Sequence, residues 1–141
     1  MFRDLKNVLK MVSVLSLMFL TTFLIKPDAA VAGAFIKTCS NIRVDFNNDR
    51  AILLAECYNN KGQIRRSNLL ISNYVANYTG ALSWATPPGN FQKSCRSAGI
   101  VDRNQGWLTA KCGNGKGGWV TSEINLDERV SNQNGVLDYD D

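Results

Sequence analysis

The second half of the chain repeats the first, and this duplication limits the folds that the sequence can adopt. Aligning residues 107–139 with 52–84 at a constant offset of 55 gives 11 identities in 33 positions. A one-residue slip upstream also places "FQKSC" (91–95) over "FIKTC" (35–39). A unit of about 50 residues buries too little surface to fold alone, so the two units must share a core or exchange strands.

Each repeat has the pattern of a series of short strands. "AILLAEC" (51–57) and "GWLTAKC" (106–112) are rich in apolar or β-forming residues, and the strands that follow, "SNLLI" and "SEINL", alternate polar and apolar positions. In each repeat, the segment between the first cysteine and the apolar strand is expected to form a loop. The sequence therefore predicts a mostly β protein.

Short turns are expected at equivalent places in the two repeats. Ser72 and Asp127 follow the second strands and are good helix N-caps, which predicts single helical turns at "SNYV" and "DERV". "NYTG" (77–80) and "NQNG" (132–135) then predict hairpin turns, because glycine adopts positive φ at little cost.

The N-terminus has the pattern of a secretory signal peptide. Three cations in the first ten residues precede an apolar run at 11–25, and "AVA" (30–32) provides small residues for cleavage. A retained membrane anchor is the alternative, but the run is shorter than the ~20 residues that a spanning helix needs. We expect a signal peptide over 1–32, one domain over 33–141, and a secreted or periplasmic protein.

The charge of the exported part is small. The whole chain has a net charge of +4, and the predicted leader carries four cations and two acids, which leaves +2. The remaining cations are scattered, whereas a nucleic-acid surface needs a clustered patch. We therefore expect no nucleic-acid partner, and no membrane association after the leader is removed.

The four cysteines all lie in the predicted exported part. An even number in a small secreted domain indicates two disulfides, and four cysteines allow three connectivities. We favour Cys39–Cys57 and Cys95–Cys112, because neighbouring strands of one repeat bring each pair together without threading the other. The chain has no histidine and no Cys-x-x-Cys, so neither a metal nor another cofactor is expected.

The segment between the repeats, residues 85–90, is the clearest linker. Pro87 and Pro88 predict a stiff, extended connection. A proline-containing hinge also favours exchange between copies, so we expect either a monomer or a domain-swapped dimer. Most aromatic side chains are assigned to the core, and Trp119 is expected to be partly exposed; the core set is Phe35, Phe91, Trp84, Trp107 and Tyr139.

The stretches "FIKTC…LLAEC" and "FQKSC…LTAKC…INLDERVSNQNGVLDY" resemble those of the cyanovirin-N homology (CVNH) family, and the resemblance covers nearly all of 33–139. It implies a pseudosymmetric, non-catalytic lectin that binds high-mannose oligosaccharides or glycoproteins, above all at α1,2-linked mannose termini. It also implies strand exchange. One lobe, here the terminal lobe, would combine the start of repeat one (35–84) with the end of repeat two (91–139), and the central lobe would be built from the middle of the chain.

The family places a carbohydrate pocket at the far end of each lobe, and its site residues carry over to matching positions of this chain. In the terminal lobe these are Lys37, Thr38, Tyr58, Asn60, Asn132, Gln133 and Asn134. In the central lobe they are Asn77, Thr79, Asn90, Lys93, Ser94 and Asn114.

Several of these positions differ from the family pattern. In the terminal pocket Tyr58 stands in place of a glutamate and Lys37 in place of a glutamine. In the central pocket Ala76 and Lys93 stand in place of acidic residues, and Gly115 in place of an arginine that clamps the sugar. We therefore expect the terminal site to be the better one and the central site to be weak or silent.

Two other classes of function are compatible with a small exported β protein to different degrees. A scaffold of the same fold that binds another glycan or a protein surface is the main alternative. A hydrolase is disfavoured, because the chain lacks histidine and its adjacent carboxylates, Asp127 and Glu128, lie in a turn without evident convergence.

Overall fold

The computed structural model describes residues 33–141, so the predicted signal peptide lies outside the described residues. This part of the chain forms ten short strands and four 3-10 turns. The strands are β1 (Cys39–Phe46), β2 (Ala51–Tyr58), β3 (Ile64–Leu69), β4 (Val75–Tyr78), β5 (Ala81–Trp84), β6 (Cys95–Asp102), β7 (Trp107–Gly113), β8 (Trp119–Asn125), β9 (Val130–Gln133) and β10 (Val136–Tyr139). The turns are η1 (Phe35–Lys37), η2 (Ile71–Asn73), η3 (Phe91–Lys93) and η4 (Leu126–Glu128).

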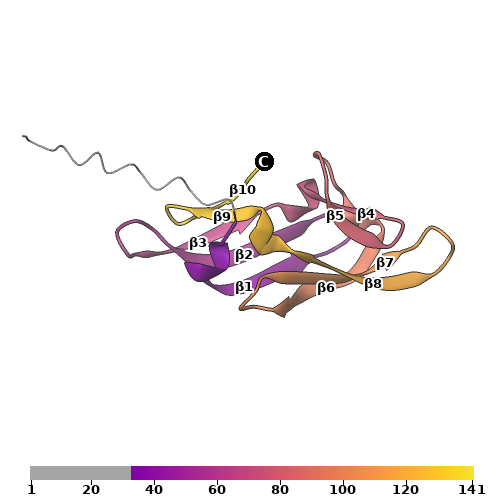
Figure 1. Cartoon of the computed structure of the whole chain (residues 1–141), viewed down its shortest axis with the longest axis horizontal. Coiled ribbons are helices and arrows are strands. Elements are labelled where there is room, and N and C mark those ends of the chain that lie inside the picture. The colour runs from indigo at the N-terminus through magenta and orange to yellow at the C-terminus, as the bar shows by residue number, and fades with distance from the viewer. Residues whose placement is uncertain (1–32) are drawn as a thin grey trace, which may run out of the picture.

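The strands form an elongated molecule with one lobe at each end (Figure 1). The terminal lobe holds the antiparallel sheet β1-β2-β3 and the hairpin β9–β10, and the central lobe holds the sheet β6-β7-β8 and the hairpin β4–β5. Each hairpin is fixed to a sheet of the other repeat by the same hydrogen bond. The Leu137 N–H donates to Ser67 Oγ (2.8 Å), and the Leu82 N–H donates to Ser122 Oγ (2.8 Å). The strand exchange implied by the family resemblance is therefore present.

The segments after Cys39 and Cys95, predicted to be loops, are strands. β1 and β6 pair with β2 and β7, and each has an irregular register near its start. Asn41 (φ 51°) and Ser97 (φ 55°) lie at these irregularities in the left-handed region. Such bulges interrupt the alternation of polar and apolar residues on which strand prediction depends.

The predicted single turns exist, but their predicted caps are wrong. η2 and η4 begin one or two residues earlier, so Ser72 and Asp127 lie inside the turns. The residue before η4 is Asn125, whose side chain accepts a hydrogen bond from the Asp127 N–H (2.9 Å). Leu70 precedes η2 and makes no side-chain cap. The turns η1 and η3 were not predicted from the sequence.

The two predicted hairpin turns are confirmed. β4 and β5 are joined by two residues, Thr79 (φ 51°) and Gly80 (φ 102°). β9 and β10 are joined by Asn134 (φ 53°) and Gly135 (φ 90°). Both central residues have positive φ, as in the type I′ turns that match the twist of antiparallel strands.

The core is shared by the two repeats. Phe35 and Phe91 are almost completely buried, as predicted, together with repeat-related pairs such as Leu53 with Leu108. Other predicted core aromatics are only partly buried: Trp84, Trp107 and Tyr139. Tyr139 stacks on Tyr74 with ring centroids 4.1 Å apart, and it packs against Trp84 at 5.7 Å.

The favoured disulfide pairing, Cys39–Cys57 and Cys95–Cys112, is the observed one. Each bridge joins residues that face each other across the first two strands of a sheet.

The linker after β5 is hydrogen-bonded at both ends to the segment around η2. The Ala85 N–H donates to the Tyr74 carbonyl (2.8 Å) and the Gly89 N–H to the Asn73 carbonyl (2.7 Å). The Pro87–Pro88 peptide bond is cis.

Candidate functional site

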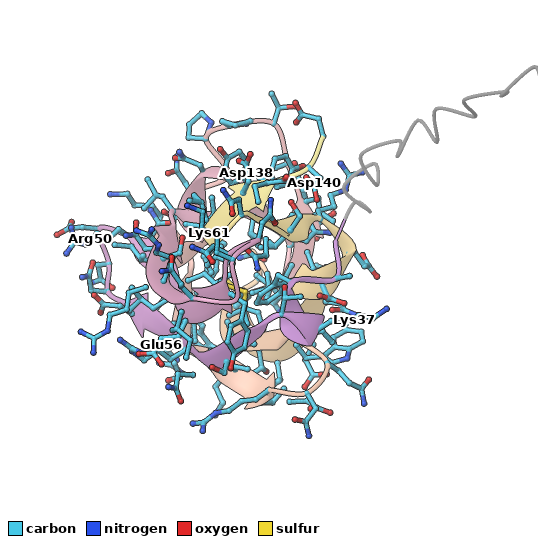
Figure 2. The ribbon with its side chains drawn as sticks, turned by 90° about the vertical axis from the view of Figure 1, so that its left-hand side faces the viewer. Lys37, Arg50, Glu56, Lys61, Asp138 and Asp140 are labelled. Atoms are coloured by element: carbon cyan, nitrogen blue, oxygen red, sulfur yellow. A yellow bond between two sulfur atoms is a disulfide. The ribbon has the colours of Figure 1, made fainter. Side chains whose placement is uncertain are left out.

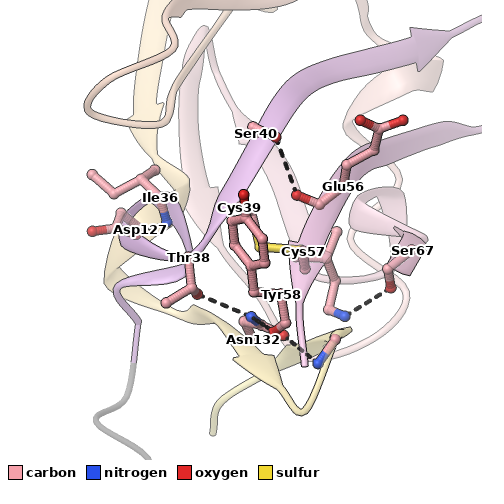
Figure 3. Close-up of a disulfide and its surroundings, with 12 residues drawn as sticks. Ile36, Thr38, Cys39, Ser40, Glu56, Cys57, Tyr58, Ser67, Asp127 and Asn132 are labelled. Atoms are coloured by element: carbon pink, nitrogen blue, oxygen red, sulfur yellow. Dashed lines mark hydrogen bonds between the residues drawn. A yellow bond between two sulfur atoms is a disulfide. The ribbon is translucent and has the colours of Figure 1, made fainter. Parts of the chain in front are cut away.

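The tip of the terminal lobe is assembled from segments far apart in sequence, and one asparagine joins them. Asn132 Nδ2 donates to Thr38 Oγ1 (2.9 Å) and to the Tyr58 carbonyl (2.8 Å). Its Oδ1 accepts the Gly135 N–H (2.7 Å). Figure 3 shows Asn132 between Thr38 and Tyr58, beside the Cys39–Cys57 disulfide. Asn132 thus attaches the exchanged hairpin to the end of the β1-β2-β3 sheet with the two hydrogen bonds that its Nδ2 donates, and the third lies within the hairpin.

A second contact attaches the turn of the same hairpin. Asn134 Oδ1 accepts a hydrogen bond from the Asn60 N–H (2.8 Å). Both side chains are exposed, as is Tyr58. Five of the seven residues predicted for the terminal site are therefore connected by hydrogen bonds: Thr38, Tyr58, Asn60, Asn132 and Asn134.

The other two residues of the predicted terminal site are placed differently. Gln133 lies behind the tip, where its Nε2 donates to Ser131 Oγ (2.9 Å). Lys37 is exposed at the end of η1, on the edge of the lobe as it appears in Figure 2. Neither side chain has a hydrogen bond to the Asn132 cluster among the contacts of the described residues.

The tip of the central lobe repeats the same attachment. Asn77 Nδ2 donates to Ser94 Oγ (2.9 Å) and to the Gly113 carbonyl (3.0 Å). Its Oδ1 accepts the Gly80 N–H (2.7 Å). Asn77, Ser94 and Gly113 occupy the positions of Asn132, Thr38 and Tyr58, so the duplication has preserved this hydrogen-bond pattern.

The second contact has no counterpart in the central lobe. Thr79 replaces Asn134, and Gly115, which has no side chain, replaces Asn60. Gly115 has φ +72°, and a Cβ there would meet nothing within 4 Å. The central tip is therefore more open and presents fewer polar side chains.

The remaining predicted residues of the central site lie around this tip without a direct contact to Asn77. Asn114 Oδ1 accepts the N–H groups of Lys116 (2.8 Å) and Gly118 (3.0 Å), which shapes the β7–β8 turn. Asn90 is exposed, has φ 58°, and its carbonyl accepts the Lys93 N–H (3.0 Å) at the start of η3. Lys93 itself is exposed.

The hydrogen bonds of Asn132 and Asn77 determine what these residues can do. An asparagine amide offers two N–H donors and one oxygen acceptor, and here the nitrogen makes at least two bonds and the oxygen one. The sequence interpretation had both side chains facing a pocket. In the structure each side chain also positions an exchanged hairpin through these hydrogen bonds. At the terminal tip, groups left free for a ligand belong chiefly to Thr38, Asn60 and Asn134 and to the ring of Tyr58.

Asn77 and Asn132 are partly exposed at the two tips. The structure also has hollows of about 340 Å³ between Trp84, Pro87 and Tyr139, and about 300 Å³ between Ser40 and Arg103. Neither hollow is lined by Asn77 or Asn132. Binding at the terminal tip would depend on hydrogen bonds to its few exposed polar groups.

The start of the described chain is held against the end of the second repeat. The Gly33 N–H donates to Asp140 Oδ2 (2.9 Å), and Asp140 Oδ1 accepts Ser131 Oγ–H (2.9 Å). The Ile36 N–H donates to Asp127 Oδ1 (3.1 Å). Partial burial raises the pKa of the Asp127 carboxyl above its ordinary value, and the backbone N–H groups of η1 oppose this only in part.

Sequence reasoning missed a polar cluster on the outer face of the terminal lobe. Glu56 accepts hydrogen bonds from Asn41 Nδ2 (2.6 Å) and Arg66 Nε (3.3 Å). The hydrogen bond from Asn41, together with the charge of Arg66, holds the pKa of Glu56 below its ordinary value. These residues lie on three different strands, so no local sequence pattern identifies them.

Residues 33–141 contain no group of three or more His, Cys, Asp or Glu side chains placed to hold a metal ion. Over the same range, no helix has the length and apolar character to cross a membrane.

The fold and its two equivalent tips define a class of duplicated, disulfide-bonded β proteins with exchanged hairpins. The family model of the CVNH domain matches residues 35–138, and this chain belongs to the CVNH family. It is similar to the CVNH protein of Gibberella zeae, with 31% identity, coverage of 74% of this chain and 95% of that one, and a TM-score of 0.63.

Two similar structures contain saccharides. The complex of microvirin with mannobiose is 28% identical, covers 76% of this chain and 98% of that one, and has a TM-score of 0.61. The MoCVNH3 variant Mo0v in complex with (N-GlcNAc)4 is 25% identical, covers 77% and 97%, and has a TM-score of 0.66. These relatives therefore bind saccharides of different chemistry on one fold.

Proposed function

We propose that this protein is a non-catalytic lectin that recognises high-mannose glycans, principally at α1,2-linked mannose termini, through the tip of its terminal lobe. The observation that carries the proposal is the attachment of Asn134 to the Asn60 backbone beside the Asn132 cluster. It fixes two exposed asparagines next to the Thr38 hydroxyl. The mannobiose complex of microvirin supports mannose as the ligand.

The exposed groups at this tip suit a neutral sugar. Vicinal hydroxyls of mannose both donate and accept hydrogen bonds, and an asparagine amide pairs with both kinds of group. Each such bond contributes only about 0.5–1.5 kcal/mol net, so a single shallow site binds weakly. Presentation of several binding sites to a branched glycan raises avidity by a factor of ~10²–10⁴.

The central lobe is the weaker mannose site in this proposal. It keeps Asn77 as the attachment of the hairpin, but Thr79 and Gly115 remove the two asparagines that are exposed at the other end. Lys93 adds a cation, which is a donor only, where a neutral sugar would need an acceptor.

A second candidate is the same scaffold with another specificity, either for a different glycan or for a protein surface. The (N-GlcNAc)4 complex of the MoCVNH3 variant favours this reading, because it shows that a relative binds a saccharide without mannose. Tyr58 and Lys37 also stand where the family pattern has acceptors for sugar hydroxyls.

We propose a binding role without catalysis, because the adjacent carboxylates do not form a hydrolytic pair. Asp127 Oδ1 accepts the Ile36 N–H, whereas Glu128 is exposed. We also propose that residues 1–32 direct export and are removed, so that the lectin acts outside the cytoplasm.

Exchanging the residues that differ between the two tips tests the proposal. The variant Asn60→Gly/Asn134→Thr gives the terminal lobe the residues that the central lobe has at the aligned positions, Gly115 and Thr79. Asn134 and Thr79 share a positive φ (53° and 51°), whereas Gly115 has φ 72° and Asn60 does not have a positive φ. We expect it to lower the affinity for α1,2-mannobiose about tenfold or more, since it removes two exposed hydrogen-bonding side chains.

The matched variant makes the opposite change in the central lobe. Thr79→Asn/Gly115→Asn should raise the number of mannose sites measured by titration calorimetry. The affinity of the terminal site should stay unchanged. A glycan array in which the native protein binds (GlcNAc)4 but no mannose-terminated glycan would establish the second candidate. An unchanged mannose affinity in Asn60→Gly/Asn134→Thr would overturn the assignment to the terminal tip.

A further inference from the structure

The outer faces of the two sheets occupy equivalent positions but carry different charges. Across β1, β2 and β3, Ser40 faces Glu56, and Glu56 faces Arg66. The equivalent row of the central lobe is Arg96 facing Lys111 across β6 and β7. Lys111 in turn faces Thr121 on β8. The first row has one acid and one base, whereas the second has two bases and no acid.

The row in the terminal lobe is internally paired. Glu56 forms the ion pair with Arg66 (3.3 Å) and accepts a hydrogen bond from Asn41 Nδ2 (2.6 Å). This is the one ion pair found among residues 33–141. The acid of the terminal face is therefore paired internally, and a further cation, Arg43, lies close enough to help lower the pKa of Glu56.

The row in the central lobe leaves both cations without an acidic partner among these contacts. Arg96 and Lys111 are exposed and lie opposite each other on neighbouring strands, an arrangement of like charges that destabilises a sheet slightly. The acid of β8, Glu123, lies two residues beyond Thr121 and faces Thr109 rather than Lys111. An external anion would reduce the repulsion between the two cations.

An aromatic ring completes this face. The guanidinium carbon of Arg96 lies 4.0 Å from the centroid of the Trp119 ring. Trp119 is 48% exposed, and its position on β8 faces Gly113, which places no side chain over it. The contact with the ring restricts the position of Arg96, whose guanidinium carries several N–H donors that suit a carboxylate or sulfate. Lys93 and Lys116 are exposed nearby in the adjoining turns.

We propose that this central-lobe face, defined as Arg96, Lys111, Trp119 and Thr121, is a second binding site that takes anionic saccharides, meaning sugars that bear a carboxylate or a sulfate. Arg96 and Lys111 bind the acidic group, and the free part of the Trp119 ring packs against the apolar face of the sugar. The Thr121 hydroxyl is available to a sugar hydroxyl. This site is separate from the proposed mannose site at the other end of the molecule.

A saccharide fits this face better than a nucleic acid does. The paired cations span only two strands, and the exported part of the chain carries a net charge of only +2. A nucleic-acid groove follows the phosphate backbone over several nucleotides with repeated cations. One aromatic ring with two cations beside it matches a single acidic sugar unit.

The test measures binding of defined oligosaccharides to the purified protein by titration calorimetry and by NMR of the tryptophan indole N–H groups. The probes are a heparin-derived tetrasaccharide for sulfate, tetragalacturonate for carboxylate, and mannotetraose as the neutral sugar. We expect one or both anionic probes to bind, to shift the Trp119 indole resonance, and to bind more weakly as salt is raised. Which of the two binds assigns the acidic group.

A matched pair of variants distinguishes binding at this site from non-specific electrostatic attraction between the protein and the anionic probe. Arg96→Gln/Lys111→Gln should weaken binding of the anionic probe about tenfold or more, because it removes both charge-assisted contacts. Arg50→Gln/Arg103→Gln removes the same charge from exposed positions elsewhere and should change the affinity less than about twofold. Mannose binding at the terminal lobe should be the same in both variants, which also shows that both are folded.

Lys111→Glu reverses the charge of this side chain, and the fold already accommodates glutamate at the equivalent position, Glu56. It should abolish binding of the anionic probes. Equal losses in the two double variants would overturn the proposal. Binding of a single-stranded oligonucleotide of equal charge at least as tightly, through the same residues, would also overturn it in favour of a nucleic-acid surface.

Discussion

Replacing Asn132 with alanine measures how strongly one side chain attaches the exchanged hairpin. The substitution removes two hydrogen bonds from Nδ2, to Thr38 Oγ1 and the Tyr58 carbonyl, and one that Oδ1 accepts from the Gly135 N–H. Each bond contributes about 0.5–1.5 kcal/mol net, and the partly exposed site lets water replace some of this. We expect the free energy of unfolding to fall by about 1.5–3 kcal/mol, a substantial part of the ~5–15 kcal/mol typical of a domain.

The measurement is denaturant unfolding followed by tryptophan fluorescence, with the slope against denaturant checked for each variant. Asn77→Ala should give a loss of similar size, because Asn77 makes the same three kinds of contact in the central lobe. Asn132→Asp keeps the acceptor for the Gly135 N–H but loses both donors, so its loss should be intermediate.

Asn60→Gly is the control for a nearby exposed side chain. It should lower the free energy of unfolding by less than about 1 kcal/mol, since Asn60 contacts Asn134 only through its backbone N–H. A loss below about 0.5 kcal/mol in both Asn132→Ala and Asn77→Ala would refute the view that these residues attach the hairpins. A large loss would mean that the effect of Asn132→Ala on sugar binding must be read together with its effect on folding.

Three further predictions concern other parts of the fold. Burial raises the pKa of Asp127, so the native state binds this proton more tightly than the unfolded state does. The free energy of unfolding should therefore fall as pH rises from the ordinary value of 3.8 through the raised pKa of the native state. Asp127→Asn keeps the acceptor oxygen and should show a smaller fall over that range in denaturant titrations at several pH values. Replacing Cys95 and Cys112 with serine opens a loop with a sequence separation of 17 and should cost about 3 kcal/mol by calorimetry, whereas an unchanged melting temperature would contradict this. Gly135→Ala places a Cβ at φ +90° and within 2.9 Å of Arg65 Cγ, so it should destabilise by at least about 1 kcal/mol in the same assay.

The local features of this fold follow from the sequence because their causes are local. The apolar runs that end at Cys57 and Cys112 form strands, and the glycines of the two hairpins adopt the predicted positive φ. The favoured disulfides were also predicted, since each joins residues of one repeat. The strands after Cys39 and Cys95 were predicted to be loops because the bulges in them interrupt the alternation of side chains.

The candidate site was predicted less completely. The family resemblance indicated which positions lie at the tips, and the structure brings five of the seven terminal residues together. It gives Asn132 and Asn77 a positioning role that their sequence context does not reveal, because the partners of their Nδ2 groups lie between 17 and 94 residues away. The number of bonds that an amide makes depends on distances that only folding sets.

The sequence by itself determined the β character, the two hairpin turns and the favoured cysteine pairs, since each depends on residues within one repeat. Comparison of the two halves of the sequence also revealed the duplication. Tertiary structure decided which hairpin completes which lobe and therefore which asparagine serves which tip. It also decided that Arg96 lies on Trp119 and opposite Lys111, while the equivalent Glu56 is paired with Arg66. The two repeats are similar in sequence, but the charge of each outer face depends on side chains from three strands, and only their pairing brings those side chains together.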